Sequence, residues 1–487
     1  MNNKSKILSI ITLLMFFALL FSTTYAYFTA QGGNPSSANL RLTTYTTDVF
    51  TFAIGDAISF NVDQDNFASG QGNILSNTFA SAKLTANNKN NLASDSYYLY
   101  LSITNNTFSY SISQRYPEVI MTIRDNNGNE VTNLTTLNHV VVTDATGMKV
   151  SGYDITDKNG LISIFENRVI TTTSSIEEKW NITITFVNYN VSQNANAGKS
   201  LSAKVIVQKN KIPNVLSDVC NNGDNLLLCI TKLSSKSISS ATNIYYHDGT
   251  LENGISDNSY RYAGTSDSVN NYICLGGDVN VCSDDNLFRI IGVIDNHIKV
   301  IKKNPIGDML WDEVGFNTWS VSTLNTYLNG EYLSKLSDFS EKIISATWKV
   351  GGNTKFNLSY VTPQKAYQNE IINPVATNSK DDKLEYNAKI GLIYVSDFYY
   401  AAHPIGWTLT GNNYDKVKMY NWMSGTWEWT ISRYANYQNY VSCILNNGMI
   451  YIHNANKNHF VRPVFYLAND LDYKGGIGSF DDPIRIS

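Results

Sequence analysis

The chain has 487 residues, of which 43% are hydrophobic and 16% are charged, and its formal net charge is -4. This composition supports folded cores and excludes a disordered chain, and the length allows two or three domains. The acidic balance, with no run of Lys or Arg interleaved with aromatic residues, argues against nucleic-acid binding.

Residues 1–26 have the pattern of a signal peptide. Lys4 and Lys6 precede an uncharged apolar run, and Thr24 and Ala26 are small residues where signal peptidase reads the chain. We expect cleavage between Ala26 and Tyr27, and therefore a protein that is secreted or held at the bacterial cell surface. The alternative is an uncleaved N-terminal anchor, which would be the chain's membrane attachment.

Residues 27–208 carry the pattern of an antiparallel β-sandwich. Leu99–Thr104 and Trp180–Phe186 alternate apolar residues with polar or less apolar ones, so each strand has one buried and one wet face. We predict seven to nine strands in this domain. Further expected features are strands at Val119–Ile123, Val140–Val142 and Leu201–Val207, and a hairpin turn at Asn127-Gly128.

Two stretches at the ends of residues 1–208 resemble the exported camelysin and TasA family of bacterial matrix proteins. They are YAYFTAQGG, with ANLRL after it, and ITITFVNYNVSQNANAGKSLSAKVIVQK. The resemblance implies a sandwich that assembles outside the cell, in some members by passing an N-terminal strand to a neighbouring copy. Camelysins are also described as metal-dependent proteases. The chain has no HExxH motif, and His139 has no second ligand in helical register.

Residues 209–239 are expected to form a linker and a short helix. Pro213 blocks continuation of a strand within a polar stretch. Apolar residues between Leu226 and Leu233 then follow an amphipathic helical pattern, with Asp224 or Asn225 as the N-cap.

The stretch NLFRIIGVIDNHIKVIK, from Asn286 to Lys302, predicts a hairpin around which the C-terminal part is organised. Both faces of its strands are largely apolar, as in strands buried between layers, and the turn is expected at Asp295-Asn296-His297. Four later stretches are expected to cover it: residues 390–403, 421–433, 461–467 and 483–486.

Helical patterns are mixed with the strands of this part, which indicates an α+β module. Residues 319–336 predict a helix capped by Ser320 or Ser322, with a break at Asn329-Gly330. A second helix is expected from Ser396-Asp397.

All five cysteines follow the expected linker. In an exported protein they are read first as disulfides, and the short separations favour Cys220 with Cys229 and Cys274 with Cys282. Cys443 is left free, and its apolar neighbours indicate a buried structural thiol rather than a nucleophile. A zinc site using four thiols is the alternative, although no CxxC spacing occurs.

Residues 240–487 resemble a widespread, functionally uncharacterised family of bacterial surface domains. The motifs are DNLFRIIGVI, STLNTYLNG, AKIGLIYVSDFYYAA, NWMSGTWEWTISR, NNG, VRPVFYL and GGIGSFDDPIRI. Their order is similar to that of the C-type lectin-like and formylglycine-generating-enzyme superfold. The resemblance implies a strand from Trp429 to Arg433, a hairpin through Asn446-Asn447-Gly448, and a closing Val-Arg-Pro strand.

The tryptophans of this part are the candidate ligand-binding residues, for sugar rings or Tyr-rich peptides: Trp407, Trp422 and Trp427. Trp429, Arg433 and Arg462 fit a buried layer better, with Arg462 paired to Asp397 or Glu428. Of the three candidates, Trp422 and Trp407 are expected to be the more exposed. The acidic pairs Asp284-Asp285 and Asp481-Asp482 could bind calcium, but they also fit solvated turns.

The sequence therefore predicts a multidomain, non-enzymatic exported protein: an N-terminal β-sandwich for assembly or matrix attachment, followed by a C-type lectin-like α+β module for display or adhesion. Its expected partners are itself in a head-to-tail fibre, other matrix proteins, or a glycan or host-surface protein. We predict no catalytic residues, metal or cofactor. The alternative is an extracellular enzyme, either a camelysin-like protease or a formylglycine-type oxidase.

Overall fold

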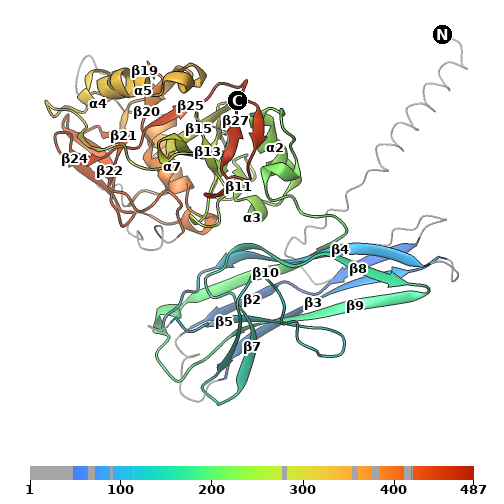
Figure 1. The fold of residues 1–487 in the computed structure, drawn as a ribbon. Helices are drawn as coiled ribbons and strands as arrows, with labels where there is room; N and C mark the ends of the chain where they lie inside the picture. The colour runs from blue at the N-terminus through green and yellow to red at the C-terminus, as the bar shows by residue number, and fades with distance from the viewer. Residues whose placement is uncertain are drawn as a thin grey trace, which may run out of the picture. The chain divides into compact units, whose positions relative to one another are not determined.

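A computed structural model describes residues 48–63, 72–87, 92–112, 115–276, 282–353, 360–375, 383–410, 418 and 420–487. The predicted cleavage site at Ala26 and Tyr27 and the segment Tyr27–Tyr45 lie outside these residues. Antiparallel sheets dominate the described chain (Figure 1).

The first ten strands form two antiparallel sheets that face each other as a sandwich (Figure 1). The six-stranded sheet has the order β1-β3-β9-β5-β7-β6, and the four-stranded sheet has the order β2-β10-β4-β8. The predicted count of seven to nine strands is therefore too low. The strands are β1 (Val49–Ile54), β2 (Ile58–Val62), β3 (Ile74–Thr85), β4 (Ala93–Asn106), β5 (Val119–Arg124), β6 (His139–Thr143), β7 (Lys149–Asp154), β8 (Gly160–Thr172), β9 (Ser175–Phe186) and β10 (Lys199–Gln208).

Alternation along the strands fills the core between the two sheets. Leu99, Leu101 and Ile103 of β4 meet residues such as Ile182 and Ile184 of β9 in one buried cluster. Each side chain on such a face removes apolar surface from water, which is worth about 1.5–3 kcal/mol per fully buried aliphatic residue. The predicted inward rows are thus confirmed.

The outward face of β4 was expected to be exposed to solvent along its whole length. At Tyr100 this is wrong, because that side chain is buried. The backbone N–H of Ile212, itself buried, donates to the Tyr100 hydroxyl at 3.2 Å. Part of the segment 209–217 therefore packs on the strand, while Lys209, Asn210 and Lys211 are exposed.

The C-terminal part contains a nine-stranded sheet, a six-stranded sheet and a strand pair. The nine-stranded sheet runs β20-β25-β15-β14-β13-β27-β26, with β12 on β14 and β11 on β12. Its strands are β11 (Ile244–Tyr246), β12 (Tyr260–Tyr262), β13 (Tyr272–Cys274), β14 (Leu287–Ile294), β15 (His297–Lys302), β20 (Ile390–Gly391), β25 (Val464–Tyr466), β26 (Tyr473–Gly475) and β27 (Ile484–Ile486).

The six-stranded sheet runs β16-β24-β21-β22-β23, with β18 beside β21, and β17 pairs with β19. The hairpin predicted through Asn446-Asn447-Gly448 joins β22 to β23. These strands are β16 (Asp308–Leu310), β17 (Ala346–Lys349), β18 (Gly352–Asn353), β19 (Glu385–Ala388), β21 (Glu428–Tyr434), β22 (Tyr440–Ile444), β23 (Ile450–Asn454) and β24 (Asn458–Phe460).

The predicted central hairpin is β14 paired with β15, and all eight residues of β14 are buried. Its turn is Asp295-Asn296, both with positive φ, as a two-residue type I′ connection requires. His297 already belongs to β15, so the turn is one residue shorter than predicted. Glycine is required at position 292, where β12 pairs with β14. A Cβ there would stand 2.1 Å from the Tyr260 carbonyl oxygen.

Three of the stretches expected to cover this hairpin extend its sheet instead, and the first does so at Ile390–Gly391, which pairs with β25. Val464–Tyr466 pairs with β15, and Ile484–Ile486 pairs with β13. Residues 390–403 and 421–433 do supply buried side chains to the same core. A short apolar stretch is equally typical of a neighbouring strand in the same sheet and of a segment that packs over the sheet. The sequence pattern therefore did not distinguish the two roles.

Short helices connect many of the strands in the described chain. Asn225 is the N-cap of α2 and Ser322 of α4, each by accepting from a backbone N–H three residues on. At Asn329-Gly330 the helix changes to π geometry and continues, so the predicted break is wrong. The helices are η2 (Asn194–Asn196), η3 (Leu216–Asp218), α2 (Leu226–Lys236), α3 (Ser239–Thr242), η4 (Asp284–Asn286), η5 (Trp319–Val321), α4 (Thr323–Tyr327), η6 (Leu328–Tyr332), α5 (Leu333–Lys335), η7 (Ser337–Lys342), α6 (Pro363–Tyr367), η9 (Gln368–Ile372), α7 (Val395–Tyr400) and η10 (Pro404–Gly406).

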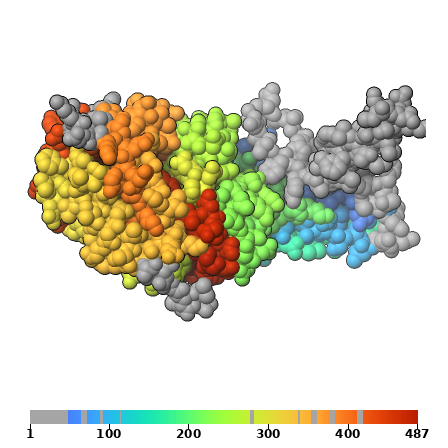
Figure 2. All heavy atoms as spheres, turned by 90° about the horizontal axis from the view of Figure 1, so that it is seen from above, coloured from blue at the N-terminus to red at the C-terminus, as the bar shows by residue number. Residues whose placement is uncertain are grey.

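Helix α2 joins the core of the C-terminal part. Leu226, Ile230 and Leu233 are buried in the cluster that contains the central hairpin. The chain end lies beside this helix, since Leu226 N–H donates to Leu471 O and Tyr473 N–H donates to Asp224 O. In Figure 2 the red C-terminal segment accordingly borders green surface. The segment predicted to be a linker and a short helix thus contributes to this core.

Candidate functional site

A groove of about 740 Å³ lies beside strand β8 of the sandwich. One wall is the loop 129–136 and the other is formed by residues 163–169 of β8. Val131 and Leu134 are half-buried against the sandwich core, and the Leu134 N–H donates to the Tyr153 hydroxyl at 2.9 Å. The lining of the groove is mostly polar, with some apolar side chains such as Val131 and Leu134, and its loop is fastened to the core.

Strand β8 stands at the end of the four-stranded sheet and, among the described strands, pairs only with β4. It spans 13 residues, whereas the edge strands β1, β2 and β6 span 6, 5 and 5. An edge strand presents backbone N–H and C=O groups that can accept another strand. The Ser163 hydroxyl, on the groove side, is buried and has no hydrogen-bond partner among the described residues.

A hydrogen-bonded chain holds two residues that line this groove, Arg168 and Trp180. Trp180 Nε1 donates to the Tyr97 hydroxyl at 2.7 Å, and that hydroxyl donates to Glu178 Oε2 at 2.6 Å. Arg168 donates to both carboxylate oxygens of Glu178 and stacks over the rings of Phe165 and Trp180. Burial and the Glu178 carboxylate both raise the pKa of Tyr97, so its hydroxyl stays protonated. The wall is preorganised rather than mobile.

A second surface lies on the six-stranded sheet of the C-terminal part. Trp427 is 43% exposed and stacks on His459 with 4.8 Å between ring centroids, while Tyr451 is 51% exposed and contacts His453. We call this surface, formed by Trp427, Tyr451, His453 and His459, the aromatic–histidine face. It can offer rings to a sugar or an aromatic side chain.

Of the three predicted ligand-binding tryptophans, Trp427 alone is exposed. The expectation that Trp407 and Trp422 are the more exposed is wrong, because both are buried. Trp407 Nε1 donates to Ala402 O at 2.9 Å and Trp422 Nε1 donates to Tyr262 O at 2.9 Å. The N–H group of each indole is therefore hydrogen-bonded inside the fold, and both side chains belong to the core.

Charged residues in the same part are paired in the interior. Arg462 pairs with Glu428, one of the two predicted partners, and both side chains are buried. Asp397 accepts instead from Lys299 Nζ at 2.6 Å and from Arg261 Nη1 at 3.1 Å. Burial alone would raise the pKa of Asp397, but the two cations outweigh it and lower that pKa. These pairs hold elements together and offer no open site.

The cysteines form the two predicted disulfides, Cys220–Cys229 and Cys274–Cys282, each with 5.8 Å between Cα atoms. The four-thiol zinc site is therefore wrong, since these sulfurs are oxidised. Cys443 is free and buried in β22, and burial raises the pKa of its thiol to about 12. That thiol is structural, as predicted.

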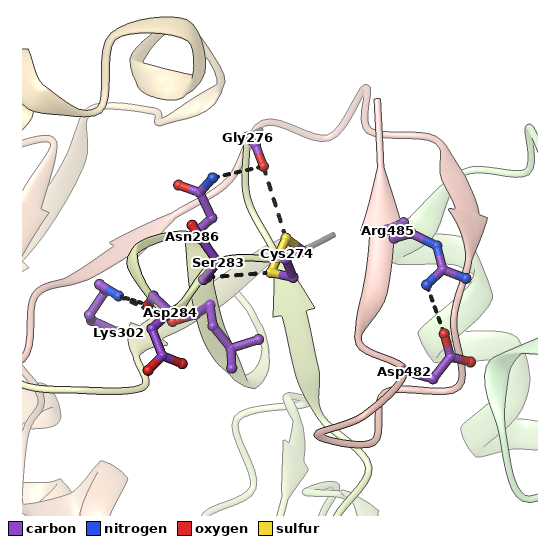
Figure 3. Close-up of a disulfide and its surroundings, with 10 residues drawn as sticks. Cys274, Gly276, Ser283, Asp284, Asn286, Lys302, Asp482 and Arg485 are labelled. Atoms are coloured by element: carbon purple, nitrogen blue, oxygen red, sulfur yellow. Dashed lines mark hydrogen bonds and ion pairs between the residues drawn. A yellow bond between two sulfur atoms is a disulfide. The ribbon is translucent and has the colours of Figure 1, made fainter. Parts of the chain in front are cut away.

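The two acidic pairs lie on separate turns. Figure 3 shows Asp284 near the Cys274 disulfide and Asp482 beside Arg485. Asp482 pairs with Arg485 at 2.7 Å and Asp284 with Lys303 at 3.7 Å, which fits solvated turns. Within the described chain, the one cluster of three or more His, Cys, Asp or Glu ligands close enough for a metal is Cys220, Asp224 and Cys229. His139 contacts Glu130 at 2.9 Å.

Sequence reasoning did not find the groove or the histidine pair. The groove depends on how the loop 129–136 folds back over β8, and its sequence signal is the spacing of Val131, Leu134 and Leu137. The pair depends on the short turn between β23 and β24, which are not neighbours in the sheet, and the alternate spacing of Tyr451 and His453 was its signal.

Among the described residues, no helix is both long and apolar enough to cross a membrane. A scan against models of protein families finds no match for this chain, and a search of curated proteins finds none either.

Proposed function

We propose that this chain is an exported cell-surface or matrix protein whose sandwich assembles by accepting an additional strand along β8. The C-terminal part, which we read as C-type lectin-like, then displays a ligand-binding face. The observation that carries the proposal is the 13-residue edge of β8 beside a groove of about 740 Å³. Main-chain hydrogen bonds would provide affinity and side-chain pockets specificity, as in other cases of strand addition.

The segment Tyr27–Tyr45 is the proposed occupant of the groove in a neighbouring copy. Its length suits the role: 19 residues reach roughly 60 Å when extended, and β8 is about 40 Å long. Leu40 and Leu42 alternate with polar neighbours, so one face of the segment is apolar. A head-to-tail contact of this kind propagates into a filament. If the segment filled its own groove, the protein would remain a monomer.

Filament formation by the mature protein tests this function. We expect concentration-dependent filaments by light scattering and electron microscopy, and their loss when Tyr27–Asn34 is deleted, with the β-sheet circular dichroism retained. Leu42→Asp should also prevent assembly, whereas Arg41→Asp, on the opposite face of an extended segment, should allow it. A mature protein that stays monomeric at high concentration would refute assembly.

The display role is supported by the aromatic–histidine face, where Trp427 and Tyr451 are the exposed rings. Neutral sugars bind such rings by stacking, and aromatic peptide side chains do so as well. A glycan and matrix-protein screen of the full chain, with Trp427→Ala beside it, tests this role. Cleavage of casein by the purified protein would instead favour the enzymatic alternative.

A further inference from the structure

His453 and His459 bring two imidazole nitrogens into direct contact on the aromatic–histidine face. His453 Nδ1 and His459 Nε2 are 2.6 Å apart, and the ring centroids are 4.8 Å apart. The residues come from β23 and β24, which a short turn connects. Trp427 stacks on both rings, at 4.8 Å from His459 and 6.3 Å from His453, and so fixes their planes.

Both imidazoles are suited to donate lone pairs. Burial, with the neighbouring His453, lowers the pKa of His459 to about 4. Burial and Lys457 lower the pKa of His453 as well. The short contact between Nδ1 of His453 and Nε2 of His459 needs a lone pair on one of the two nitrogens, and a neutral imidazole is the form that binds a metal. In this contact, the N–H of one ring donates a hydrogen bond to the lone pair of the other ring.

The separation of the nitrogens is close to what a shared metal ion needs. Imidazole nitrogens bind zinc at about 2.0–2.1 Å, so two of them on one tetrahedral or square ion stand roughly 3 Å apart. Moving from 2.6 Å to this separation requires a shift of a few tenths of an ångström in each ring. His453 is half-buried, so an ion can reach the pair from solvent.

We propose that His453 and His459 form a two-imidazole site for a borderline divalent cation, zinc or copper. Imidazole ligands suit both ions. This site goes beyond the proposed display role and does not depend on assembly through β8. When the ion binds, the ring that carries the bridging proton keeps it by changing tautomer, with the N–H moving to its other ring nitrogen, so both facing nitrogens offer a lone pair.

The remaining coordination positions are open. In the described chain no third His, Cys, Asp or Glu joins the two histidines in a close ligand cluster. The nearby Cys443 thiol hydrogen-bonds with Trp427 and has a raised pKa, so it stays a protonated thiol. Water or an atom of an external ligand would complete the shell, next to the exposed rings of Trp427 and Tyr451. The site is thus built to present a metal ion at the surface.

Equilibrium dialysis with metal analysis tests the proposal on chelator-stripped full-length protein, with Zn²⁺ and Cu²⁺ in separate arms. We expect about one tightly held ion per chain, and its loss in His453→Asn and in His459→Gln. His297→Gln is the matched control, because among the described residues the side-chain hydrogen bond of this imidazole is to Asp295 O in its own turn. Circular dichroism checks the fold of each variant.

A spectroscopic measurement distinguishes metal coordination by His453 and His459 from a histidine pair that is only hydrogen-bonded. Electron paramagnetic resonance of the Cu²⁺-loaded protein should show two nitrogen ligands in the wild type and in His297→Gln, and at most one in His453→Asn. Equal binding by all variants, or no binding by the wild type, would overturn the site and leave a hydrogen-bonded histidine pair. His453→Asn keeps the test decisive if the more buried His459→Gln fails to fold.

Discussion

Arg168 on β8 and Glu178 on β9 form a two-point ion pair, with both hydrogen bonds at 2.7 Å. The two strands belong to different sheets, so the pair joins the sheets beside the groove. Arg168 also lies over the ring of Trp180, at 4.8 Å from its centroid. The wall of the proposed strand-accepting groove is therefore held by contacts that exist before any partner arrives.

Replacing Arg168 with Ala should lower the free energy of unfolding by about 1–2 kcal/mol, because a charge-assisted pair and a ring contact are lost at a partly exposed site. Chemical denaturation of the two proteins measures this. Lys158→Ala, which removes a 3.4 Å surface pair with Asp157, is the control and should change stability by less than about 0.5 kcal/mol. Equal effects of the two substitutions would show that the pair does not stabilise the wall.

Asp397→Asn should lower the free energy of unfolding far more than Arg168→Ala does. It leaves Lys299 and Arg261 buried without their shared carboxylate, and breaking a buried pair in this way costs about 3–5 kcal/mol. Thermal unfolding should show a large fall in Tm. Asp470→Asn removes an exposed partner of Lys342 and should be nearly neutral. A mild effect of Asp397→Asn would mean that water reaches the two cations.

Glu370 predicts a specific pH dependence of stability. It is buried and accepts from the N–H groups of Val395 and Ser396 and from the Ser432 hydroxyl. Burial outweighs these donors and raises its pKa from 4.5 to about 7. Because the folded pKa is the higher one, this group's contribution is fully present below about pH 4.5 and is lost as the pH rises through 7.

The stability difference between wild type and Glu370→Gln isolates that contribution, since the amide does not titrate. Urea unfolding from pH 4 to pH 8 should show the wild type losing stability relative to the variant across this window. A difference that is constant with pH would contradict a raised pKa.

Cys443 should resist alkylation in the native protein. Its side chain is buried and its thiol pKa is raised to about 12, so almost no thiolate is present at neutral pH. Iodoacetamide should label this residue only after denaturation, and the four other cysteines only after reduction. Rapid labelling of the folded chain would show that β22 opens. Non-reduced peptide mapping provides the pairing in the same experiment.

Local patterns predicted much of the fold because the strands alternate. Leu99, Leu101 and Ile103 point into the sandwich, and the positions Asp295 and Asn296 form the hairpin turn. The buried state of Trp422 was not predictable in this way. Its indole is satisfied by the Tyr262 carbonyl, 160 residues earlier, and no local pattern specifies such a partner.

The candidate sites were less predictable than the strands for the same physical reason. His453 and His459 are six residues apart, and their contact depends on the turn between β23 and β24. The groove depends on Leu134 docking against Tyr153, which joins a loop to a strand. Contacts of this kind are set by tertiary packing, whereas alternation reports only which face of one strand is buried.

The central claim is that the sandwich assembles by strand addition along β8. Sedimentation of the Val169→Lys variant, with Val141→Lys as its control, tests this claim most directly. Val169 lines the groove on β8 and is 59% exposed, and Val141 lies on the edge strand β6 of the other sheet and is 58% exposed. Neither substitution disturbs the core, and a lysine on an edge strand blocks strand addition. We expect mature Val169→Lys to remain monomeric while the wild type and Val141→Lys form filaments. Filaments of Val169→Lys equal to those of the wild type would contradict strand addition along β8.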